Sequence, residues 1–149
     1  MAPYSRRAGA IFRDEGFTLI ELMITVAIVA ILAVVALASY RAQIVRSNRS
    51  AAQSFMLDAA SKEERYLLDN RQYASGATAL TTLGLSVPAE VSGNYTITIT
   101  ADATLTVPNY TISATPIAAQ LRDDTSCGTL TLDYLGTKAA SLGGATCWR

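Results

Sequence analysis

A single carboxylate, that of Glu21, opens an apolar segment long enough to cross a membrane. Residues 22–40 contain no charged side chain, and a helix of that length spans about 28 Å, close to the ~30 Å hydrocarbon core of a bilayer. A carboxylate at the edge of such a segment is costly in lipid unless it has a partner. Its position therefore indicates charge pairing, the alternative being a plain signal anchor in which Glu21 has no role.

The two cysteines form the second chemical pair of the sequence. Cys127 and Cys147 lie near the C-terminus, and the chain contains no histidine. Two cysteines without histidine make a poor zinc site. Downstream of a membrane segment they are expected to form a disulfide in an oxidising compartment, which would stabilise the fold by roughly 3 kcal/mol for a loop of about 20 residues.

The remaining polar residues do not resemble an active site. The carboxylates form no recognisable pair, and Thr125 and Ser126 have no visible base to activate them. The tyrosines at 66, 73, 95 and 110 are expected in the core or at interfaces. We therefore predict that the protein is not an enzyme and uses no cofactor.

The N-terminal residues 1–16 differ in composition from the segment that follows. They include Arg6, Arg7, Arg13, Asp14 and Glu15 and have no apolar core of their own, so they are not an ordinary secretory signal. The apolar segment follows the junction of Gly16 and Phe17. Cleavage at this junction would leave the hydrophobic helix in the mature protein.

Residues 17–69 are predicted to form one long helix, because this stretch contains neither proline nor glycine. The first half is apolar on all sides, as expected in a membrane. In the second half apolar residues recur at helical spacing and predict a stripe that packs on a partner surface: Val45, Ala52, Phe55, Met56, Ala59, Tyr66 and Leu67. The charged residues Arg49, Lys62, Glu63, Arg65 and Asp69 are expected on the opposite face.

The C-terminal half changes from helical to alternating periodicity. After a turn-rich connector at 70–93, strands are predicted at 95–100, 110–115, 129–133 and 138–140. In the first two, apolar and hydroxyl side chains occupy opposite faces. An antiparallel sheet of three or four strands would cover the helix stripe, which predicts an α+β fold with a single head.

Together these residues resemble the type IV pilin family. The match consists of Gly16, then FTLIELM at 17–23, an apolar run and Tyr40. The C-terminal part, with Cys127, Asp133, Gly136, Lys138 and Cys147 followed by Trp148, resembles PilE-like minor pilins. The resemblance implies the pilin fold: a long N-terminal α-helix packed on a small antiparallel head with a C-terminal disulfide loop.

The resemblance also implies a processing and assembly pathway. A prepilin peptidase would cut between Gly16 and Phe17 and methylate the new Phe17 amine, and Glu21 would pair with that amine, within the subunit or in a neighbour. The implied organisation is a leader at 1–16, a membrane anchor and filament core at 17–46, and a head at 47–149. The implied partners are other pilins, the peptidase, the inner membrane, an assembly platform and an ATPase. The implied location is the inner membrane, then an extracellular pilus.

One departure from the family pattern concerns the apolar helix. Many type IV pilins carry a glycine and a proline there, which permit local melting in the filament. At the matching positions this chain has Ala30 and Ala38, which favour helix. We expect this subunit to remain more continuously helical.

Two other functions remain open. The C-terminal region also resembles DNA-receptor minor pilins, and Arg49, Lys62, Arg65 and Arg71 could form a basic stripe, although the chain has a net charge of zero. A type II secretion pseudopilin shares the N-terminal motif. Such subunits often carry a calcium site in place of a C-terminal disulfide, and Asp123 and Asp124 alone are weak evidence for calcium. The pair Cys127 and Cys147 therefore favours a pilus. The leading hypothesis is a minor subunit of a type IV pilus supporting biogenesis, twitching motility, adhesion or DNA uptake.

Overall fold

The computed structural model describes residues 16–102 and 107–148, without the side chains of Ala38 and Ala145. The chain divides into two compact units, Met1–Ala38 and Ser39–Arg149. The leader predicted at 1–16 lies outside the described residues except for Gly16. The predicted boundary between membrane anchor and head, at 46/47, stays a prediction.

The long helix α1 covers Leu19–Asn70, close to the predicted 17–69. It is long and apolar enough to cross a membrane by length and composition. In the first unit the described side chains from Phe17 to Leu37 are all exposed, and large apolar residues such as Leu32 have 62% of their surface accessible. The surface of this segment is therefore almost entirely apolar, which is unfavourable in water.

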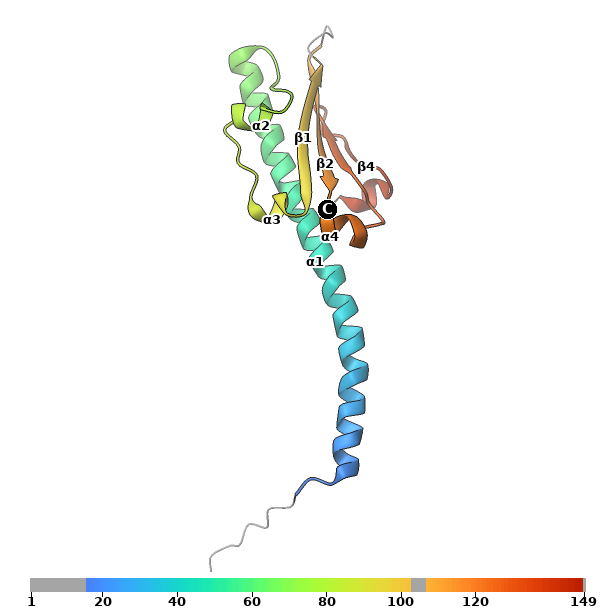
Figure 1. Ribbon diagram of the computed structural model, residues 1–149. Helices are drawn as coiled ribbons and strands as arrows, with labels where there is room; N and C mark the ends of the chain where they lie inside the picture. Colours follow the sequence, from blue (N-terminus) through green and yellow to red (C-terminus); the bar gives the residue numbers. More distant parts are fainter. Residues whose placement is uncertain (1–15, 103–106, 149) are drawn as a thin grey trace, which may run out of the picture. The chain divides into compact units, whose positions relative to one another are not determined.

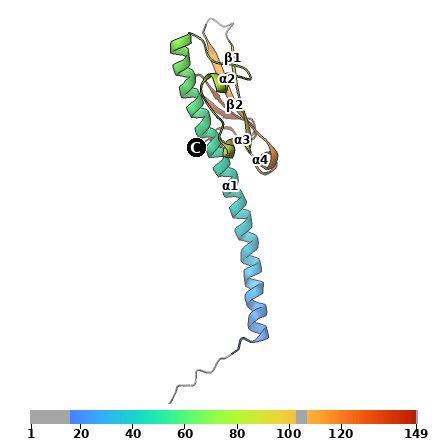
Figure 2. The ribbon, with the colours of Figure 1, turned by 60° about the vertical axis from the view of Figure 1, so that its left-hand side comes forward.

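The second unit contains a four-stranded antiparallel sheet in the order β1-β2-β3-β4. The strands are β1 (Tyr95–Asp102), β2 (Asn109–Pro116), β3 (Leu130–Asp133) and β4 (Lys138–Ala140). Figures 1 and 2 show, from two directions, that the C-terminal part of α1 lies along this sheet. The α+β fold predicted from the alternating pattern is confirmed.

The core lies between that part of α1 and one face of the sheet. The register places Ile99 opposite Ile112, and Ile112 opposite Leu132, so these side chains line up across three strands. They are buried against Met56 of α1. On the other sheet face the paired residues are Thr98, Ser113 and Thr131, as the period-2 pattern predicts.

Two expectations about the charged face of α1 were wrong. Glu63 is fully buried, and the side chain of Arg49 retains only 15% of its surface. Both lie on the same side as Ala52, Met56 and Ala59, because positions spaced alternately by three and four residues share one helix face. The prediction that they are exposed rested on their charge alone. In the structure both side chains bind partners in the head and are held in the interior.

Short helices complete the second unit. Within the turn-rich connector lie α2 (Ala79–Thr82) and α3 (Ala89–Ser92). The sequence did not predict α4 (Ala118–Asp123) or the 3₁₀ turn η1 (Gly144–Cys147). Both are too short to show a helical period, and α4 begins at Ala118, whose φ of 50° is unusual for a residue with a side chain.

Candidate functional site: the processing motif and the polar clamp

The first candidate site is the start of α1. The backbone N–H of Glu21 donates to the Thr18 hydroxyl oxygen at 3.3 Å, and the N–H of Leu22 donates to the Thr18 carbonyl at 3.2 Å. Thr18 is therefore the N-cap, and the spacing Thr18-x-x-Glu21 is that of a capping box. Sequence reasoning missed this cap, although the threonine and glutamate three residues apart signal it.

The cap determines what precedes the helix. Gly16 and Phe17 lie outside α1 and are exposed, Phe17 at 83%. A peptide bond outside a helix can be reached by a peptidase without unwinding hydrogen-bonded backbone. Glu21 lies in the first turn, where a carboxylate also interacts favourably with the helix dipole.

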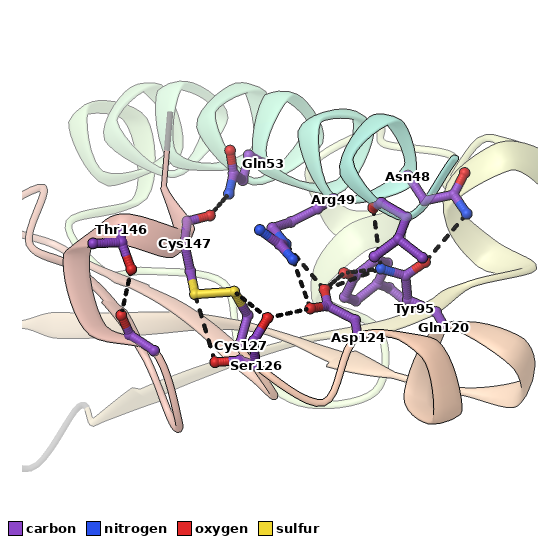
Figure 3. Close-up of polar contacts among 12 residues, drawn as sticks. Asn48, Arg49, Gln53, Tyr95, Gln120, Asp124, Ser126, Cys127, Thr146 and Cys147 are labelled. Atoms are coloured by element: carbon purple, nitrogen blue, oxygen red, sulfur yellow. Dashed lines mark hydrogen bonds and ion pairs between the residues drawn. A yellow bond between two sulfur atoms is a disulfide. The ribbon is translucent and has the colours of Figure 1, made fainter. Parts of the chain in front are cut away.

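The second candidate site is a connected group of polar side chains around the buried Tyr95, Gln120 and Asp124. We call it the polar clamp: Asn48, Arg49, Tyr95, Gln120, Asp124 and Ser126 (Figure 3). Arg49 binds Asp124 through two parallel bonds, Nε to Oδ2 at 2.9 Å and Nη2 to Oδ1 at 2.6 Å. This bidentate geometry is the strong form of an arginine–carboxylate pair. The side chain of Asp124 is 1% exposed, so these bonds replace contacts with water.

Gln120, on α4, connects the clamp to two other elements, α1 and β1. Its amide N–H groups lie within bonding distance of the Tyr95 hydroxyl at 2.9 Å, Asp124 Oδ2 at 3.1 Å and the Val45 carbonyl at 3.2 Å. Asn48 donates to the Gln120 carbonyl oxygen at 3.2 Å. The clamp thus holds α1 to the end of α4 and to β1. Its polar groups form their hydrogen bonds with one another.

The clamp changes the acidity of Tyr95. Burial, followed by the negative charge of Asp124, raises the pKa of the Tyr95 phenol to about 12. Tyr95 therefore stays neutral at physiological pH and serves as a hydrogen-bonding group, not as a base.

Beside the clamp lies the disulfide predicted from the sequence. Cys127 and Cys147 are bonded, with Cα atoms 5.7 Å apart. The Gln53 amide donates to the Cys147 carbonyl at 2.6 Å and ties this loop to α1 (Figure 3). A Cβ at Gly143 would collide with the Cys147 sulfur and the Ser126 carbonyl, so the closed loop requires glycine there.

A third buried polar group lies near the end of α1. Glu63 Oε2 accepts a hydrogen bond from the Ala74 N–H at 2.9 Å, and this bond fixes the chain after α1. Burial raises the pKa of Glu63, although the Ala74 bond opposes that change. Close by, the rings of Tyr73 and Tyr110 meet edge to face at 4.6 Å.

One member of the basic stripe considered for DNA is not available to a phosphate. Arg49 is bound within the polar clamp, whereas Arg65 and Arg71 are exposed and Lys62 is half-buried. Asp58 and Asp69 lie four residues from Lys62 and Arg65, one turn away on the helix. Among the described residues there is no group of three or more potential metal ligands, and Asp124 is committed to Arg49.

Comparisons with known proteins cover both the processing motif and the polar clamp. Residues 11–37 match the prokaryotic N-terminal methylation motif, and residues 38–131 match the family described as type IV minor pilin ComP, DNA uptake sequence receptor. The chain belongs to the type IV pilin family. Members of this family are structural pilus subunits and not enzymes.

Several pilins are similar to this one. It is 44% identical over 79 residues to the type IV wide pilus major component PilA4 of Thermus thermophilus, a match covering 52% of this chain and 60% of that protein. It is 31% identical over 114 residues to fimbrial protein EcpC of Eikenella corrodens, covering 75% and 71%. A fimbrial protein of Neisseria meningitidis is 37% identical over 82 residues, covering 55% and 46%. The match thus spans 60% of the Thermus protein and about half of the Neisseria protein.

A solved type IV pilin from Shewanella oneidensis has the same fold. The structures match with a TM-score of 0.51 at 24% identity, over 70% of this chain and 98% of the other. At this identity the likeness concerns the pilin fold, which agrees with the helix, sheet and disulfide described above.

Proposed function

We propose that this pilin is a minor subunit of a type IV pilus, held in the inner membrane by residues 17–46 as a single span before it enters an extracellular filament. The observation that carries the proposal is the exposed apolar surface of α1 from Leu19 to Leu37, which lies within the residues matched to the methylation motif. A helix that is apolar on all sides needs lipid or other apolar helices around it.

The mechanism is processing followed by polymerisation. Prepilin peptidase cuts between Gly16 and Phe17, outside the capped helix, and methylates the Phe17 amine. The helix then leaves the bilayer, with the help of an assembly platform and an ATPase, and exchanges lipid for other subunits. A head-to-tail interface that does not close produces a helical filament.

Glu21 supplies the charge in this mechanism. Cleavage converts the Phe17 amide into an ammonium, and opposite charges attract strongly in a low-dielectric layer. We expect Glu21→Val to be processed but poorly incorporated, measured as the ratio of filament-bound to membrane-bound subunit. Glu90→Val, at an exposed head position, serves as the control, and normal incorporation of Glu21→Val would refute the role.

A second candidate is a DNA receptor for uptake, favoured by the family matched over 38–131. Phosphate binding depends on lysine and arginine contacts, and the exposed members of the predicted basic stripe are Arg65 and Arg71. The test is fluorescence anisotropy of labelled duplex DNA with the full chain in detergent at low salt. Binding that weakens in Arg65→Glu/Arg71→Glu, but not in Arg122→Glu, would support it, and the absence of binding would reject it.

A further inference from the structure

A groove in the second unit lies beside the polar clamp and shares Asn48 and Gln120 with it. It has a volume of about 510 Å³ and lies between α1 and α4, with Arg41, Asn48, Asn94, Arg122 and Asp123 among its lining residues. Arg41 and Arg122 come from positions far apart in the sequence. The fold therefore assembles a polar groove with two guanidinium groups.

The arginines of this groove are available for a ligand. Arg41 and Arg122 are exposed, and neither has an ion-pair or hydrogen-bond partner within the described residues. Arg46, also exposed, lines an adjoining groove that shares Arg41. Arg49 is neutralised by Asp124. The local charge is positive even with Asp123 present, although the chain as a whole is neutral.

The position of Arg41 indicates which anion can reach it. Arg41 directly follows the uncharged residues 22–40, so in a membrane-held subunit it lies at the level of the lipid headgroups. The exposed Tyr40 is a residue type enriched at that level. Ile44 adds an apolar side chain to the groove wall. A site with guanidinium groups and an apolar wall suits an amphiphile better than a free ion.

We infer that this groove binds the phosphate headgroup of an anionic phospholipid while the pilin is held in the membrane. The inference rests on the membrane-held state proposed above. The contact orients the head on the bilayer surface through α4, and assembly into the filament must release it. Each arginine near an anionic surface is expected to raise occupancy about fivefold.

The experiment compares lipid compositions on the intact protein. The full chain is reconstituted in nanodiscs of phosphatidylcholine with or without 30 mol% phosphatidylglycerol, and amide hydrogen exchange is followed by mass spectrometry. With phosphatidylglycerol, peptides covering Ala118–Asp123 should exchange at least about fivefold more slowly at low salt, and the difference should vanish in 0.5 M salt.

Charge-reversal variants test the arginines themselves. Arg41→Glu/Arg122→Glu should lose the lipid-dependent protection, and Arg65→Glu/Arg71→Glu, with the same change of charge elsewhere, should keep it. Equal exchange in both lipids, or unchanged protection in Arg41→Glu/Arg122→Glu, would overturn the inference. So would full protection by inorganic phosphate on phosphatidylcholine discs, which would identify a free-anion site.

A further measurement separates this inference from the proposed function. Flotation of the reconstituted chain with vesicles tests the membrane-held state itself. A chain that does not float contradicts the proposed anchor. A chain that floats but shows no lipid-dependent protection contradicts only lipid binding by the groove. A defect of Arg41→Glu/Arg122→Glu that is seen only in filament incorporation would show that these arginines contact a neighbouring subunit instead.

Discussion

The two stretches of α1 differ in what surrounds them, although both belong to one helix. From Leu19 to Leu37 every side chain is exposed and almost all are apolar. From Asn48 to Leu67 an apolar stripe is buried on the sheet, and charged residues such as Arg49 and Glu63 are bound on the same side. Among the described residues of its own unit nothing covers the first stretch, whereas the sheet covers the apolar stripe of the second.

This difference shows that the residues that make the helix continuous do not determine what each stretch packs against. A run without proline or glycine is sufficient for a continuous helix through Ala30 and Ala38. The stretch packed on the sheet is stabilised by the head of the same chain. The stretch before it has to be stabilised by lipid or by other subunits, so substitutions in the two stretches should affect different measurements.

The largest effect on stability is expected from the polar clamp. Asp124→Ala leaves Arg49 without its counter-ion and removes an acceptor from Gln120, Tyr95 and Ser126. Loss of one partner of a buried pair costs about 3 kcal/mol or more. Urea unfolding of the full chain in detergent, followed by Trp148 fluorescence, measures this. The exposed neighbour Asp123→Ala should change the free energy of unfolding by less than about 0.5 kcal/mol, and equal losses in the two variants would contradict the clamp.

The disulfide should have the next largest effect. Cys127→Ser/Cys147→Ser opens a loop of sequence separation 20, and the expected loss is roughly 3 kcal/mol from the greater entropy of the unfolded chain. The same urea titration measures it, and a reducing agent should reproduce the loss in the native chain. An unchanged unfolding midpoint after complete reduction would show that this bond does not stabilise the head.

A matched pair of apolar truncations compares the two stretches directly. Met56→Ala removes a fully buried side chain and should lower the free energy of unfolding by about 2–5 kcal/mol if the cavity does not collapse, with the low end expected for flexible methionine. Leu32→Ala removes an exposed one and should change it by less than about 0.5 kcal/mol. A comparable loss in Leu32→Ala would mean that the first stretch packs on the head.

The smallest expected effect is the pH dependence due to Glu63. Its pKa is raised above the reference value of 4.5, so above that pH the unfolded chain releases a proton that the folded chain retains. The free energy of unfolding therefore falls as pH rises from about 4.5 to the folded pKa, and is level above it. Glu63→Gln can still accept the Ala74 bond and should abolish this fall, as urea titrations between pH 4 and 8 would show. A fall of the same size in Glu63→Gln would assign it to other carboxylates.

The sequence predicted the regular elements because their signals are local. Alternation at Tyr95 and Tyr110 located β1 and β2 within a few residues, and the uninterrupted helical stretch located α1. The misplaced charges, Arg49 and Glu63, depend on partners that are 75 and 11 residues away, which a single sequence does not reveal. Asp124 looked like a weak calcium ligand for the same reason. The Thr18 cap was detectable, since its motif is contiguous.

The most direct test of the account is mass spectrometry of filaments sheared from cells that produce this chain. The account predicts that the subunit in these filaments begins with N-methylated Phe17 and contains the Cys127–Cys147 disulfide. Finding it at low stoichiometry would also support a minor subunit. Filament subunits that retain residues 1–16, or filaments that lack the chain while it accumulates cleaved in the membrane, would contradict the account.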